Sequence, residues 1–69
     1  MMALTPQRRF VTPMADEALE SLAARALPEL PLAEAMERIQ GWNLHIFLMR
    51  RPRGLLLGGD VVFIEPPQA

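Results

Sequence analysis

Cysteine is absent from this 69-residue chain. Its absence excludes the disulfide framework that stabilises many small secreted domains. It also excludes thiolate zinc ligands and a cysteine nucleophile. A chain of this length buries only about 60% of the surface that its unfolded form exposes. We therefore expect its stability to come from one thin core or from contact with a partner.

A long apolar run is also missing. No stretch approaches the roughly 20 apolar residues that span a bilayer. Arg8 and Arg9, near the start, are not followed by the apolar region of a secretory signal. We therefore expect a cytoplasmic protein with no membrane partner.

Neither sign of charge dominates the sequence. The formal net charge is -1, and 51% of the residues are hydrophobic while 22% are charged, which is typical of a globular domain. A nearly neutral chain with few aromatic residues offers little for a nucleic acid to bind. No nucleic-acid partner is expected.

Two short segments have the composition of β-strands. Phe10 to Thr12 precede Pro13, and Val61 to Ile64 follow a glycine turn and end shortly before Pro66. Aromatic and β-branched residues favour strands, and proline ends sheet pairing. We predict one short strand near each end of the chain.

The middle of the chain has the apolar spacing of two amphipathic helices. Apolar residues recur at i, i+3, i+4 and i+7 in both segments. The spacing predicts a first helix from about Met14 to Leu27, capped by Thr12 or Asp16, and a second from Leu32 to Trp42. The connection between them is short, so the two helices should be neighbours in space.

The run "LHIFLM", Leu44 to Met49, is apolar almost throughout, so periodicity does not decide its type. Because it is short and ends at "RRPRG", we predict extended chain there. The order strand, helix, helix, extended segment, strand indicates an α+β fold. We expect a single domain over residues 1–69 with a core from about 8 to 67.

This order, together with three short motifs, resembles the LysM family. The closing motif is "LGGDVVFIEP", residues 57–66, and the opening motif is "FVTPMADEALESLAARAL", residues 10–27. Asn43 stands where LysM modules carry an asparagine after the second helix. The resemblance implies a β-α-α-β domain in which two short antiparallel strands pack on a helix pair.

The chain departs from the family pattern at two loops. Ala15-Asp16-Glu17 replaces the family's Gly-Asp-Thr turn, Asn43 is followed by Leu44 rather than proline, and the segment from 43 to 58 is longer than usual. In carbohydrate-binding members these two loops form the sugar groove. The departures therefore bear on glycan binding more than on the fold.

Catalytic chemistry has little support in the sequence. The single His45 lies between two apolar residues, with no cysteine or second histidine beside it, and a structural or surface role is the simpler interpretation. Ser21, Thr5 and Thr12 have no histidine base near them in sequence. The acidic residues are spread over predicted helix surfaces. We expect no enzyme activity, no metal site and no cofactor.

Two loops and one arginine cluster carry the candidate binding residues. The resemblance implies glycan or partner contacts from Pro13, Met14, Ala15, Asp16 and Glu17, and from Asn43, Leu44, His45, Ile46 and Phe47. Arg50, Arg51 and Arg53 are the candidate partner-contact loop, since guanidinium groups bind carboxylates and phosphates through paired hydrogen bonds. A solvated loop is the simpler alternative for these arginines.

Two functions fit these observations. The first is a structural adaptor that makes protein contacts in a larger assembly, as stand-alone LysM-like proteins do in phage tails and contractile injection machines. The second is a module that binds the N-acetylglucosamine chains of peptidoglycan. An unrelated small α/β protein, such as a regulatory or toxin-antitoxin component, is a third possibility.

Overall fold

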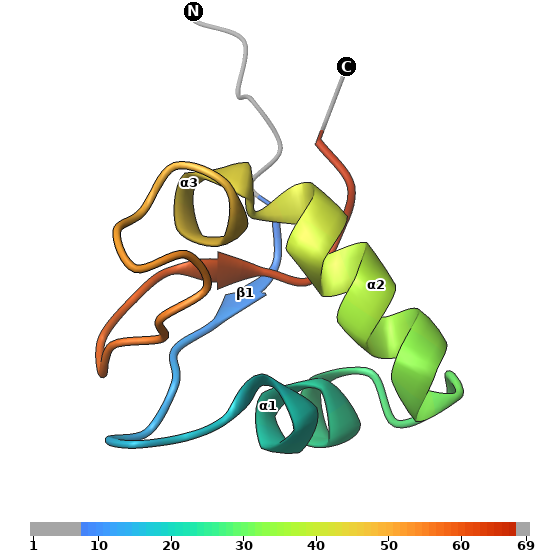
Figure 1. The fold of residues 1–69 in the computed structure, drawn as a ribbon. Helices are drawn as coiled ribbons and strands as arrows, with labels where there is room; N and C mark the ends of the chain where they lie inside the picture. The colour runs from blue at the N-terminus through green and yellow to red at the C-terminus, as the bar shows by residue number, and fades with distance from the viewer. Residues whose placement is uncertain (1–7, 68–69) are drawn as a thin grey trace, which may run out of the picture.

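A computed structural model of the protein describes residues 8–67. The elements follow in the order β1 (Phe10–Val11), α1 (Leu19–Ala26), α2 (Leu32–Trp42), α3 (Leu44–Phe47) and β2 (Val62–Phe63) (Figure 1). Two antiparallel strands combine with helices, so the predicted α+β class is confirmed. The outermost parts of the predicted domain, including Thr5, lie outside the described residues.

The two strands lie near opposite ends of the described chain and pair with each other. Phe10 is opposite Phe63 and Val11 is opposite Val62 in an antiparallel register. The Ile64 N–H donates to the Arg9 carbonyl at 3.0 Å, which extends the ladder by one step. The sheet is this short because Pro13 follows β1 and Pro66 follows β2, and proline has no N–H to donate.

The core lies between the sheet and the helices. α2 packs against α1, α3 and β2. The buried hydrophobic side chains are Leu22, Ala23, Leu27, Ala35, Ile39, Ile46, Leu56, Val62 and Ile64. Most of the helical members occupy the positions that the i, i+3, i+4 spacing selects, and α2 has the bounds predicted for it.

The predicted start of the first helix is wrong. α1 begins at Leu19, not at Met14, and neither Thr12 nor Asp16 caps it. Asp16 has a φ of 60°, a left-handed conformation that does not belong to a right-handed helix. Residues 14–18 therefore form a loop before α1, and Ala18 occupies the N-cap position of the helix without a side-chain capping hydrogen bond.

The prediction of extended chain after Asn43 is also wrong. Leu44–Phe47 forms the single helical turn α3. The N–H groups of Ile46 and Phe47 both donate to the Asn43 carbonyl, at 2.9 and 3.0 Å. The turn places Ile46 in the core, and an apolar run of six residues carries no periodicity that could have revealed this.

Candidate binding surface

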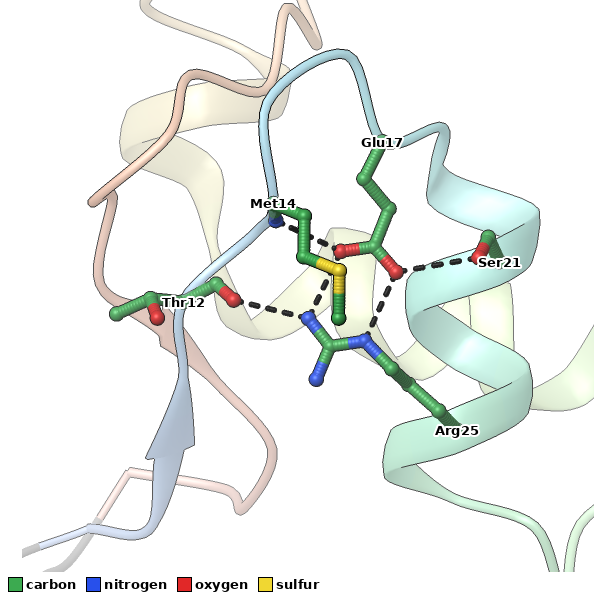
Figure 2. Close-up of polar contacts among 5 residues, drawn as sticks. All are labelled: Thr12, Met14, Glu17, Ser21 and Arg25. Atoms are coloured by element: carbon green, nitrogen blue, oxygen red, sulfur yellow. Dashed lines mark hydrogen bonds and ion pairs between the residues drawn. The ribbon is translucent and has the colours of Figure 1, made fainter.

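The loop before α1 is held by one carboxylate, that of Glu17 (Figure 2). It accepts hydrogen bonds from the Met14 N–H at 2.9 Å, from Ser21 Oγ at 3.1 Å, and from Arg25 Nε and Nη2, both at 2.8 Å. Arg25 Nη2 also donates to the Thr12 carbonyl at 2.9 Å. Arg25, and then the Met14 N–H, lower the pKa of Glu17 from 4.5 to about 2. Glu17 is therefore an ionised structural group.

The other predicted residues of this loop divide into one buried residue and three exposed ones. Pro13 is buried, whereas Met14, Ala15 and Asp16 are exposed. The backbone of Gly58 lies against the loop, since a Cβ built at Gly58 would stand 3.9 Å from the Ala15 nitrogen. The loop thus has the turn before β2 as its neighbour.

Asn43 is a buried structural residue. Its side-chain nitrogen donates to the carbonyls of Ile39 and Phe63, at 2.7 and 2.9 Å, and its Oδ1 accepts the Phe63 N–H at 2.7 Å. Because the carboxamide satisfies both backbone groups of Phe63, it replaces a third strand at the outer edge of β2. With no exposed surface, Asn43 does not reach a ligand in this structure.

The remaining predicted residues of α3 differ in exposure. Ile46 is fully buried and Phe47 is half-buried against Gly54, while Leu44 is 52% exposed. The exposed His45 lies with Nε2 3.3 Å from the Val61 carbonyl and its ring edge-on to Phe63. Leu44 and His45 are thus the exposed members of the predicted set in α3.

The three arginines of the predicted contact loop have different roles. Arg50 makes a bidentate ion pair with Asp60, with N–O distances of 2.6 and 2.8 Å, and also donates to the Leu55 carbonyl. This pairing lowers the pKa of Asp60. It also joins the start and the end of the connection between α3 and β2. Arg51 and Arg53 are exposed, and Arg51 Nη1 donates to the Leu48 carbonyl at 3.4 Å.

Exposed apolar side chains gather on α3 and on the segment that links it to β2. Of the nine large hydrophobic residues that are exposed within 8–67, six lie here, and we call them the α3-segment surface: Leu44, Leu48, Met49, Leu55, Leu57 and Val61. Figure 1 shows this segment at the opposite side of the view from α2. Exposed hydrophobic side chains that form a contiguous patch are typical of interaction sites.

Leu55 and Leu57 were not predicted as binding residues. They flank the buried Leu56 in the run "LLL" between Gly54 and Gly58. In extended chain, side chains alternate between two faces, so the run itself could have indicated that only its middle residue or its two outer residues would be buried.

Within residues 8–67, no three His, Asp or Glu side chains come together as a metal site, and none of the helices described there is long and apolar enough to cross a membrane. No family model, curated protein or solved structure matches the chain.

Proposed function

We propose that this chain is a non-catalytic, LysM-like binding module that acts as a structural adaptor, making protein contacts in a phage-tail-like or contractile injection assembly. The observation that carries the proposal is the α3-segment surface. It supplies six exposed apolar side chains, and apolar side chains enclosed by polar neighbours are the usual centre of a protein interface.

Contacts within the connection between α3 and β2 support a surface that is ordered before it binds a partner. The Arg50–Asp60 pair joins the two ends of the connection, and the Gly54 N–H donates to the Ile46 carbonyl at 2.8 Å. A surface that is ordered before binding loses less conformational entropy when it meets its partner. Arg51 and Arg53 then add polar contacts beside the apolar ones.

The same structure favours the adaptor over the peptidoglycan alternative. A sugar groove would need the loop 13–17 and the residues 43–47 as its two walls. Glu17 is instead engaged with Arg25, Asn43 and Ile46 are buried, and loop 13–17 lies against Gly58. No hydrogen bond within the described chain joins these two walls.

The test is incorporation into a particle. The full chain, affinity-tagged and produced in its native organism, should sediment with a high-mass assembly that contains tail-tube, sheath or baseplate proteins identified by mass spectrometry. Met49→Ser should weaken this incorporation, because Met49 is 71% exposed on the α3-segment surface. Met14→Ser is the matched control, since Met14 is 65% exposed but lies in the loop before α1.

A pull-down on insoluble peptidoglycan with salt washes tests the glycan-binding alternative. No retention is expected. Retention that Met14→Ser weakens and Met49→Ser leaves intact would overturn the adaptor proposal in favour of the glycan-binding one.

A further inference from the structure

The outer face of α2 combines exposed side chains, Ala33, Glu37 and Gln40, with Met36, which is partly buried against the core. Ala33, Met36, Glu37 and Gln40 line a shallow depression of about 380 Å³ along it. These positions follow the i, i+3, i+4, i+7 spacing and form one stripe of the helix, which we call the α2 stripe. The core-facing residues Ala35 and Ile39 are completely buried.

The charges of the α2 stripe and of the α3-segment surface are opposite. Four ion pairs are present among residues 8–67: Arg9–Glu65, Arg25–Glu17, Arg38–Glu34 and Arg50–Asp60. Glu37 on the stripe belongs to none of them, and neither do Arg51 and Arg53 beside the α3-segment surface. An acidic, partly apolar stripe and a basic, apolar surface are therefore both left exposed.

The two surfaces cannot meet within one molecule, because α2 and the segment after α3 lie on opposite sides of it (Figure 1). They can meet between two molecules. We infer that the α2 stripe of one copy binds the α3-segment surface of a second copy, head to tail, with Glu37 facing Arg51 and Arg53. Complementary charge sets the register of such a contact, and Met36 contributes its apolar part.

A head-to-tail contact uses two different surfaces of each copy, so it repeats and produces a ring or a filament rather than a closed pair. This inference rests on the proposed function, because it names the partner of the same α3-segment surface. It also specifies how an adaptor of this size could encircle or extend an assembly.

The experiment is sedimentation velocity of the full chain over a concentration series up to about 1 mM. The wild-type chain should form species larger than a dimer as concentration rises. Glu37→Arg and the double variant Arg51→Glu/Arg53→Glu should each raise the dissociation constant at least about tenfold, because like charges then face each other. Glu20→Arg, the same charge reversal on the exposed face of α1, is the matched control and should change nothing.

Mixing the two charge-reversed variants is the decisive step. Each should be monomeric alone, and their equimolar mixture should associate, because every contact then joins opposite charges again. Recovery in the mixture also demonstrates that both variants are folded. The inference is overturned if the wild-type chain stays monomeric, if only one variant loses association, or if the mixture fails to recover.

These results separate the inference from the proposal beneath it. A wild-type chain that is monomeric throughout the series, yet sediments with the particle, would overturn the self-contact and leave the adaptor role in place. A chain that self-associates as described but never enters a particle would overturn the adaptor role and leave the self-contact in place.

Discussion

At the scale of single residues, polar side chains do structural work that the sequence suggests only in part. Asn43 was predicted as a binding residue, and Glu17 was assigned to the same site. In the structure the Asn43 side chain satisfies backbone groups of β2, and the Glu17 side chain satisfies a backbone group of its own loop. The sequence indicated that these two residues matter. It did not indicate which of their side-chain atoms are already hydrogen-bonded, because for Asn43 that depends on a residue 20 positions away.

Replacing Asn43 should be costly. Asn43→Ala leaves the N–H and the carbonyl of Phe63 without their side-chain partner, and an unsatisfied buried polar group costs about 1–3 kcal/mol. We expect the free energy of unfolding to fall by about 2 kcal/mol in urea denaturation. Gln40→Ala, which removes an exposed amide from α2, should change it by less than about 0.5 kcal/mol. Equal losses in both variants would contradict the structural role of Asn43.

Glu17 should make the protein sensitive to acid. Its pKa is lowered from 4.5 to about 2 in the folded state, so below pH 4.5 the unfolded chain takes up a proton that the folded chain does not. The stability that this carboxylate contributes is therefore fully present above pH 4.5 and is lost as the pH falls towards 2. The lowered pKa of Asp60 acts in the same direction.

Urea midpoints across that pH window test this expectation. Glu17→Gln should reduce the loss of stability on acidification, and Arg25→Gln should reduce it in the same way because it removes the main cause of the shift. The double variant should add little to either single one. A pH profile identical to that of the wild-type chain would show that the pair has no role in acid stability.

At the scale of elements, the order of the chain was predictable and two boundaries were not. The bounds of α2 follow from its spacing and from Gly41 near its end. The start of α1 was placed too early because Thr12-Pro13 has the sequence of a helix start. The Glu17 network instead keeps residues 14–18 out of the helix.

The connection after α3 contains two glycines with a positive φ, Gly54 and Gly59. Gly54 has a φ of 76°, and a Cβ there would stand 3.2 Å from Phe47 Cδ1. A left-handed conformation costs other residues about 1–2 kcal/mol, so Gly54→Ala should lower the free energy of unfolding by at least that amount. Gly41, in the helix α2, is the opposite case, because a Cβ added there has no atom within 4 Å to collide with.

We expect Gly41→Ala to raise the stability by about 0.5–1 kcal/mol, since alanine restricts the unfolded chain and favours helix. Thermal and urea unfolding of the two variants should therefore shift in opposite directions. Shifts of the same sign would mean that the positive φ at Gly54 is not required.

At the scale of the whole molecule, the apolar residues divide between a thin core and the exposed positions of the α3-segment surface. Leu22 has no exposed surface, whereas Leu48 is 50% exposed. Leu22→Ala should cost about 3 kcal/mol, within the range for buried leucines. Leu48→Ser should cost about half as much, because half of the Leu48 surface stays exposed to water in the folded chain. Chemical denaturation of both variants measures the contrast, and a large loss in Leu48→Ser would assign that residue to the core rather than to an interface.

The sequence by itself determined the two helices, the two strands, and the class to which they belong. Spacing, β-branched residues and proline act locally, so they can be recognised without knowing the rest of the chain. Only the tertiary structure decided that Leu44–Phe47 is helical, that Asn43 completes a sheet edge, and that Arg50 is paired while Arg51 and Arg53 are exposed. The contacts of Asn43 and Arg50 join residues that are 20 and 10 positions apart in sequence, and such contacts leave no local pattern.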